Sequence, residues 1–389
     1  MRVRRAADKA ASGRRKALAS VASRLAGFKP AHEVLVRVRA VRTLFPWLNL
    51  VSRVGGWPTA RFTLAHGKSS NGKTEFAHGI GASFLAADGF YAFVDAEQTT
   101  PFDWTETLLG SELSRSPGFI AMRPSTYEET RGEVRRFCDG VAEAREGGDI
   151  DAETPAIIVL DSIRKLVPKN IWDELTREAE GKAKRGRGGR EQARGIDGMG
   201  GRAAQIKAAL NAAWLDELIP LLAQTDCAML CIARQTLDDD GNVKIGGGGA
   251  LVYDSSMVVE IERDSLVTDG GEGASAIVYG ERHAVVVRKS KVAGRSEKWP
   301  TAYYHSSNGR LVPAGFDRPR DLLDMACTYG VAEKAGGGWI SLDGEKLGQG
   351  MNKVVLRLHA EPALLARLEA AVLERPPPVP AEIVEEPAE

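Results

Sequence analysis

The sequence predicts an α/β protein with a central, mostly parallel sheet flanked by helices. Four apolar runs of strand length, Phe62–Ala65, Phe90–Val94, Ala156–Leu160 and Ala228–Ala233, are each followed by polar residues. The first run leads through a Gly/Ser loop into an Ala-rich helical segment. Three later runs, Met257–Ile261, Ala276–Tyr279 and Ala284–Arg288, predict an antiparallel continuation of the sheet.

The loop after the first strand fits the pattern G-x-x-x-x-G-K-[ST]. Its residues are Gly67, Lys68, Ser69, Ser70, Asn71, Gly72, Lys73 and Thr74. In such a loop the backbone N–H groups surround a nucleotide's phosphates, the lysine reaches the β- and γ-phosphates, and the hydroxyl ligates Mg²⁺. The alternative is a Gly/Ser turn with a solvated lysine, and the polar residues downstream argue against it.

Those polar residues stand where the other strands end. Asp95-Ala96-Glu97 follows the second run, Asp161-Ser162 the third and Arg234-Gln235 the fourth. Each could be only a helix cap or strand terminator, but parallel strands bring their carboxyl ends to one edge of a sheet. Glu97 is the candidate general base for the attacking water, Asp161 holds the Mg²⁺ water shell, and Gln235 senses the γ-phosphate.

With these motifs in order, the chain resembles the RecA family of bacterial and phage recombinases. The likeness includes GKSSNGKT, FVDAEQTTP, VLDSIRKLVPK, GGGGALVYDSSMVVEIER and VVVRKSKVAG. It implies a DNA-dependent ATPase that uses ATP and Mg²⁺, forms homo-oligomeric helical filaments on single-stranded DNA, searches double-stranded DNA for homology and exchanges strands. It also implies roles in DNA recombination, DNA repair and the SOS response to DNA damage.

The segment AGGGWISLDGEKLGQG at residues 335 to 350 resembles the small C-terminal domain of RecA proteins. It therefore favours this family over related circadian, helicase and archaeal ATPases. Two alternatives stay open at this point: a RecA-fold ATPase with another DNA motor or loader role, and a nucleotide-switched DNA-binding scaffold with little turnover.

The resemblance assigns further residues. Lys289 and Lys291 are expected to reach the neighbouring subunit's ATP, and Tyr253 is the expected interface aromatic. The expected DNA-binding residues are Gly246, Gly247, Gly248, Gly249, Arg202 and Lys207, with Lys184, Arg185, Arg187 and Arg190 from the basic insert at 182 to 194. Trp104 is the preferred adenine-stacking residue, and a buried core role is considered for its neighbour Phe102.

The second DNA loop, Thr236 to Ile245, departs from the family pattern. It is short, lacks an aromatic residue and contains Asp238-Asp239-Asp240, which would repel phosphate. Either the acids point away in a hairpin turn closed by Gly241-Asn242, or DNA binding relies more on the basic insert. The residues alone do not decide between these two.

Composition agrees with a cytoplasmic DNA-handling protein, located in the host cytoplasm if a phage encodes it. The formal net charge is zero, so affinity for nucleic acid must come from local charge: a basic stretch at residues 1 to 16 and the insert, which holds six basic residues. No apolar run has the length of a membrane span. The four cysteines lack metal-binding spacing and are expected to be reduced core residues.

We expect four parts along the chain. Residues 1–44 form an N-terminal oligomerisation arm, with a helix at about 11 to 27 and a strand near Val34 to Val38. Residues 45–316 form a RecA-like P-loop ATPase and DNA-binding core, which includes a helix at about 202 to 223. Residues 317–375 form a small α+β C-terminal domain, and 376–389 a disordered acidic tail.

Overall fold

A computed structural model describes residues 38–169, 171, 200–237, 243–268, 278–292, 298–304 and 315–374. The described residues from Arg39 onward form one compact unit. The N-terminal arm, the basic insert and the acidic tail lie outside the described residues, apart from residues 38–44 of the arm.

A ten-stranded sheet in the order β12-β11-β10-β9-β3-β7-β6-β4-β5, with β8 beside β7, organises the core. It is parallel from β9 to β5 and antiparallel from β9 to β12. The α/β class with a mostly parallel sheet is therefore confirmed. The strands are β3 (Phe62–Gly67), β4 (Phe90–Asp95), β5 (Phe119–Met122), β6 (Ala156–Asp161), β7 (Cys227–Leu237), β8 (Val243–Ile245), β9 (Met257–Thr268), β10 (Val278–Ser290), β11 (Lys298–Tyr304) and β12 (Gly315–Phe316).

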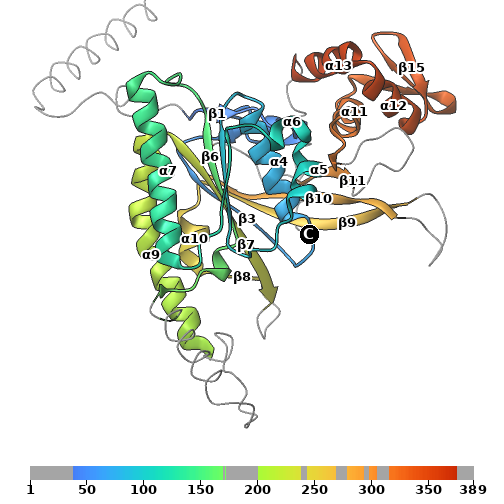
Figure 1. The fold of residues 1–389 in the computed structure, drawn as a ribbon. Helices are drawn as coiled ribbons and strands as arrows, with labels where there is room; N and C mark the ends of the chain where they lie inside the picture. Colours follow the sequence, from blue (N-terminus) through green and yellow to red (C-terminus); the bar gives the residue numbers. More distant parts are fainter. Residues whose placement is uncertain are drawn as a thin grey trace, which may run out of the picture. The chain divides into compact units, whose positions relative to one another are not determined.

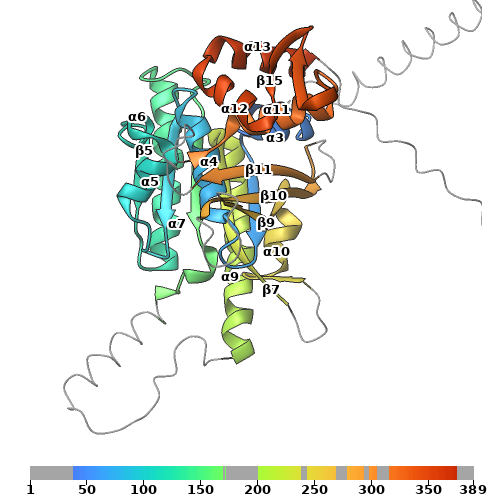
Figure 2. The ribbon, with the colours of Figure 1, turned by 90° about the vertical axis from the view of Figure 1, so that its right-hand side faces the viewer.

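Helices cover both faces of the sheet, as Figures 1 and 2 show. Alternate residues of one strand face opposite sides, so Tyr91 and Phe93 of β4 pack in one core cluster while Ala92 and Val94 pack in the other. On the first face lie α3 (Pro46–Val51), α4 (Lys73–Leu85) and α5 (Phe102–Leu109). On the second lie α7 (Tyr127–Gly147), α9 (Gly200–Thr225) and α10 (Gly249–Asp254).

Short elements complete this part of the chain. They are β1 (Ala40–Val41), which pairs with β2 (Trp57–Pro58), α6 (Ser111–Ser114) and the 3-10 helix η1 (Ile163–Lys165) after β6.

The antiparallel continuation of the sheet is confirmed, and the runs at 276–279 and 284–288 belong to one strand, because β10 continues through the polar residues between them. Residues 276 and 277 lie outside the described residues. Gly280 to His283 pair with β9 on one side and with β11 on the other. Backbone hydrogen bonds to two neighbours keep the strand extended where its side chains no longer alternate between apolar and polar.

The C-terminal region forms its own α+β core, as expected. It contains α11 (Arg318–Thr328), α12 (Met351–Ala360), α13 (Pro362–Glu374) and the antiparallel sheet of β13 (Ala332–Ala335), β14 (Trp339–Leu342) and β15 (Glu345–Gln349). A 3-10 turn, η4 (Gly336–Gly338), joins β13 to β14. Leu323, Leu342, Val354, Leu358 and Leu368 are fully or almost fully buried there.

Candidate nucleotide and DNA site

The predicted phosphate loop connects β3 to α4, and its glycines are required by their surroundings. Gly72 caps α4 with a φ of +77°, a value that L side chains rarely adopt. A Cβ at Gly72 would lie 1.9 Å from Cε1 of His283, and one at Gly67 would lie 2.3 Å from the Ile261 carbonyl oxygen. No other residue fits at either position without a shift of the β9–β10 hairpin.

The same hairpin fixes the middle of the loop. The Arg263 guanidinium donates to the Ser70 carbonyl at 2.5 Å, and Asn71 Nδ2 donates to the Ile261 carbonyl at 3.2 Å. Arg263 is paired in turn with Glu281 at 3.3 Å. Lys68, Ser69 and Ser70 are exposed, so the side of the loop that they form is open to a ligand.

Lys73 lies over this loop. Its Nζ donates to the Lys68 carbonyl at 2.5 Å. Burial lowers the pKa of the Lys73 ammonium, and nearby Asp161 opposes that shift. The partial positive charge at the start of a thirteen-residue helix adds to the ammonium charge, so the loop is suited to an anion.

Thr74 and Asp161 form the second part of the site. The Thr74 hydroxyl donates to Asp161 Oδ2 at 2.6 Å, which joins the first turn of α4 to the end of β6. Asp161 is 8% exposed, and burial raises the pKa of its carboxyl to about 6. A hydroxyl and a carboxylate side by side are oxygen ligands of the kind that Mg²⁺ prefers, so these residues fit a Mg²⁺ ion.

Glu97 lies beside them, in the turn that follows β4. Ser162 Oγ donates to Glu97 Oε1 at 3.0 Å, and the Ala96 N–H donates to the Asp161 carbonyl at 2.8 Å. The neighbouring Asp95 has a different role: it is buried and accepts from the backbone N–H groups of Thr99 and Thr100. Of the two acids, Glu97 is the one that Ser162 joins to the end of β6, and its role as general base stays a prediction.

Gln235 lies at the carboxyl end of β7, almost fully buried. Its Oε1 lies 3.1 Å from Nδ1 of His66, the residue before the loop. Sequence reasoning missed His66. Its signal was a histidine at the end of an otherwise apolar strand, which is unusual without a hydrogen-bond partner.

Several predicted DNA-binding residues come together at the glycine run. Asn211 Nδ2 of α9 donates to the Gly247 carbonyl at 2.7 Å, and a Cβ at Gly248 would lie 2.7 Å from that of Ala208. On the same helix, Lys207 Nζ donates to the Arg164 carbonyl of η1 at 2.9 Å. Gly247 and Gly248 are thus packed against α9, and Gly247 also lies near Ile163 of η1.

Other predicted DNA-binding positions lie outside the described residues. These are the side chain of Arg202 and the whole insert with Lys184, Arg185, Arg187 and Arg190. The acids Asp238–Asp240 also fall outside, but the segments on either side of them form the hairpin β7–β8, in which Leu237 pairs with Val243. This pairing agrees with the hairpin alternative for the second DNA loop.

Tyr253, Lys289 and Lys291 form a cluster at the end of α10. Tyr253 is 77% exposed, and both ammonium groups lie over its ring at 5.5 and 5.8 Å. Lys289 Nζ donates to the Val252 carbonyl at 2.8 Å and to the Tyr253 carbonyl at 2.5 Å, and Lys291 Nζ donates to the latter at 3.0 Å. Partial burial, and then the nearby Lys291, lower the pKa of Lys289.

Comparison with known proteins shows what the chain is similar to. The RecA C-terminal domain matches residues 320–375. Protein RecA of Geobacter sulfurreducens is 27% identical over 348 residues, which are 88% of each chain. Protein RecA of Chloroherpeton thalassium is 28% identical over 349 residues, or 88% of this chain and 83% of its own. The chain is thus similar to RecA proteins over most of its length, and its C-terminal region matches the RecA C-terminal domain.

The two aromatic residues of α5 differ from expectation in their burial. Phe102, considered for a core role, is 48% exposed and lies under the Arg115 guanidinium at 5.5 Å. Trp104 is half-buried, packs against the first core cluster and meets His78 edge to face at 5.6 Å. Residues two apart on a helix point to different sides, so only one of them can face the core. Adenine stacking by Trp104 stays a prediction.

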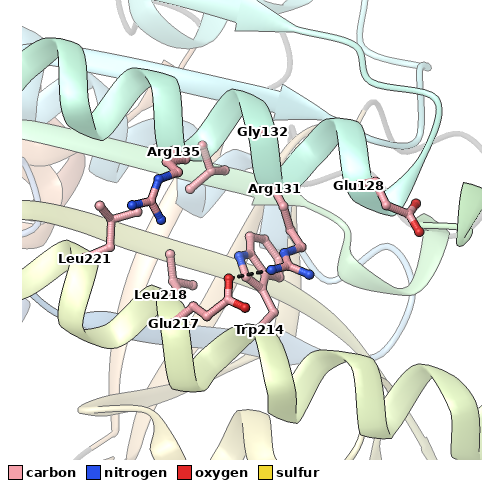
Figure 3. Close-up of a pocket in the computed structure, with 9 residues that line it drawn as sticks. Glu128, Arg131, Gly132, Arg135, Trp214, Glu217, Leu218 and Leu221 are labelled. Carbon is pink, nitrogen blue, oxygen red and sulfur yellow. Dashed lines mark hydrogen bonds and ion pairs between the residues drawn. The ribbon is translucent and has the colours of Figure 1, made fainter.

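A pocket of 310 Å³ lies away from the predicted site, between α7 and α9 (Figure 3). Arg131 and Glu217 form an ion pair across it. None of the predicted site residues lines it; its lining is Glu128, Arg131, Gly132, Val134, Arg135, Trp214, Glu217, Leu218 and Leu221.

In the described part of the chain, no helix is both long enough and apolar enough to span a membrane. Of the cysteines expected in the core, Cys138, Cys227 and Cys231 are buried and Cys327 is half-buried, and all four are free thiols.

Proposed function

We propose that this protein is an ATP-dependent homologous recombinase. It forms filaments on single-stranded DNA with ATP and Mg²⁺, pairs with homologous duplex DNA, exchanges strands and hydrolyses ATP to release DNA. The observation that supports this most is the meeting of Lys73, Thr74, Asp161 and Glu97 behind one phosphate loop. They meet in a chain that is similar over 88% of its length to RecA proteins. Roles in DNA repair and the SOS response belong to the same proposal.

The nucleotide is held by the loop from Gly67 to Thr74. Its backbone N–H groups and the start of α4 bind the phosphates, and Lys73 adds a positive charge that stabilises the transferring phosphoryl group. Thr74 and Asp161 would hold a Mg²⁺ ion. When bound, the ion neutralises charge on the phosphates.

Glu97 acts as the general base. Ser162 orients it by a hydrogen bond at 3.0 Å, and its carboxylate accepts the proton of the attacking water. Gln235 then reports the state of the γ-phosphate along the β7–β8 hairpin. Both residues lie at the carboxyl edge of the parallel strands, the usual ligand side of such a sheet.

The filament interface uses the cluster at the end of α10. In the proposed assembly Lys289 and Lys291 reach the nucleotide of the neighbouring subunit, and Tyr253 packs at the junction. The high exposure of Tyr253 supports this role, because a large aromatic side chain at the surface of a protomer is often an interface residue.

The DNA surface combines the glycine run with Lys207, Arg202 and the basic insert. Replacing Lys184, Arg185, Arg187 and Arg190 with glutamine is expected to weaken DNA binding for all sequences. The slope of the logarithm of the DNA-binding constant against the logarithm of the salt concentration should become less steep. The change should be up to about 0.7 for each lost single-strand contact and about 0.9 for each lost duplex contact. Glutamine at Arg135 and Arg136, which are exposed on α7, is the matched control. Unchanged slopes would remove the insert from the DNA surface.

A strand-exchange assay with circular single-stranded and homologous linear duplex DNA tests the function. Exchange that needs ATP and Mg²⁺ and is lost in Lys73→Ala supports the proposal. DNA-stimulated ATPase without exchange would indicate a motor or loader instead. Nucleotide-dependent DNA binding with little turnover would indicate a scaffold.

A further inference from the structure

His66 and Gln235 form a buried polar pair. The proposed chemistry gives Gln235 a role but none to His66. The two side chains are 3% and 8% exposed, and Nδ1 of His66 lies 3.1 Å from Oε1 of Gln235. His66 immediately precedes Gly67 in β3 and is flanked in register by Ala233 of β7 and Glu260 of β9. The pair therefore joins the root of the phosphate loop to the strand that carries Gln235.

The direction of this hydrogen bond follows from its atoms. An amide oxygen can only accept, so Nδ1 of His66 must carry the hydrogen and donate it. Burial lowers the pKa of His66, which favours the neutral ring; the Gln235 hydrogen bond and the Glu260 charge oppose that shift, and the Arg288 and Lys73 charges add to it. Glu260 is itself held by Arg288 at 2.6 Å. The structure thus requires the tautomer with hydrogen on Nδ1.

This bond determines which end of the Gln235 amide is left for a ligand. Phosphate oxygens only accept hydrogen bonds, so the Nε2 end of an amide can bind them and the Oε1 end is repelled. Because His66 holds Oε1, the amide is already oriented before a nucleotide arrives, with its Nε2 donor end available to the ligand. Orienting a side chain in advance reduces the entropy lost on binding.

The backbone around Gln235 is joined to the predicted DNA surface. Gln235 pairs with Ile245 of β8, and the Gly246 N–H donates to the Arg234 carbonyl at 2.9 Å. The Gln235 side chain is therefore separated from the glycine run by one hairpin pairing and one residue.

We propose that His66 is a positioning residue for nucleotide sensing, which orients the Gln235 amide so that ATP, and not ADP, strengthens DNA binding. This inference rests on the proposed function. It goes beyond that function because it assigns the sensing step to a pair of side chains that both lie outside the phosphate-loop motif.

The experiment compares single-stranded DNA affinity with a non-hydrolysable ATP analogue and with ADP. His66→Leu removes the donor, and His66→Asn places an amide N–H close to the position of Nδ1. Leucine is expected to lower the ATP-to-ADP affinity ratio about tenfold, the upper range for one hydrogen bond, and asparagine to restore most of it. ATP binding without DNA should change by less than about threefold in both, because the loop is intact.

A double-mutant test adds a readout that a purely structural role would not give. In a Gln235→Met background, His66→Leu should not lower the ratio further, because the amide to be oriented is gone. A further loss in that background would overturn the proposal, and so would an unchanged ratio in His66→Leu alone.

NMR of ¹⁵N-histidine-labelled wild-type protein provides a measurement that does not depend on the folding of any variant. The His66 signal, assigned by its absence in His66→Asn or in a second replacement, should show hydrogen on Nδ1; hydrogen on Nε2 would overturn the proposal. If the wild-type protein shows no difference in DNA affinity between ATP and ADP, the proposed function itself fails. A wild-type difference that survives in His66→Leu refutes only the role of His66.

Discussion

Asp161→Asn is expected to stabilise the nucleotide-free protein while it removes the proposed Mg²⁺ site. The Asp161 carboxyl is 8% exposed, and burial, its largest cause, raises the pKa to about 6 from an ordinary value of 3.8. A raised carboxyl pKa means that the folded state disfavours the ionised form. Asparagine keeps an oxygen that can accept from Thr74 but carries no charge.

The direction and size of this change in folding stability follow from proton linkage. The folded protein binds the Asp161 proton more tightly than the unfolded chain, so stability falls as pH rises from the unfolded pKa to the folded one, and stays reduced above about pH 6. The full difference in pKa corresponds to about 3 kcal/mol at about pH 8 and to roughly half of that at about pH 5. Asp161→Asn removes this loss.

Thermal or denaturant unfolding of the two proteins at about pH 5 and about pH 8 measures the effect. The increase in folding stability of Asp161→Asn over the wild type should be larger at the higher pH. Added Mg²⁺ and ATP should raise the melting temperature of the wild type much more than that of the variant, because ligands stabilise the state that they bind. Asp95→Asn is the control: it loses the ion pair with Arg123 at 3.2 Å and weakens bonds to two backbone N–H groups, so it should destabilise. A gain for Asp161→Asn that does not depend on pH would refute the reasoning.

Three further outcomes are expected. Glu97→Gln should bind ATP but hydrolyse it slowly and stay on DNA in a release assay; turnover at the parent rate would show that Glu97 is not the base. Lys289→Ala with Lys291→Ala should keep monomeric nucleotide binding and lose DNA-stimulated ATPase, and normal stimulation would contradict the interface. Gly72→Ala should lose nucleotide binding and melt at a lower temperature, because its Cβ would lie 1.9 Å from an imidazole carbon. Gly132→Ala on α7 is its control, because a Cβ there would have no atom within 4 Å. This variant should gain up to about 1 kcal/mol of folding stability.

Much of the sheet could be predicted from the sequence because its strands are buried on both faces. Such strands are continuous apolar runs, and the polar residues that follow them mark the edge where ligands bind. The contact between Thr74 and Asp161 and the one between Ser162 and Glu97 follow from this rule. β10 broke the pattern because strand pairing, rather than side-chain periodicity, keeps its polar middle extended.

The details that could not be predicted depend on tertiary contacts. Whether Phe102 or Trp104 faces the core depends on how α5 is rotated against α4, and both residues are equally apolar in the sequence. His66 could not be matched to Gln235, because the two are 169 positions apart in the chain and meet only through the register of β3 and β7.

The lysine cluster at the end of α10 implies a competition. In the protomer, Lys289 and Lys291 are hydrogen-bonded to the carbonyls of Val252 and Tyr253. In the proposed filament these ammonium groups turn to a neighbour's phosphates, and the carbonyls must find water or another donor. Filament assembly and the capping of the C-terminal end of α10 are then thermodynamically linked. Lysine hydrogen bonds that stabilise this helix end oppose assembly, and a nucleotide bound to the neighbouring subunit weakens those hydrogen bonds. In a protomer of this kind, these lysine hydrogen bonds disfavour filament formation when no nucleotide is present.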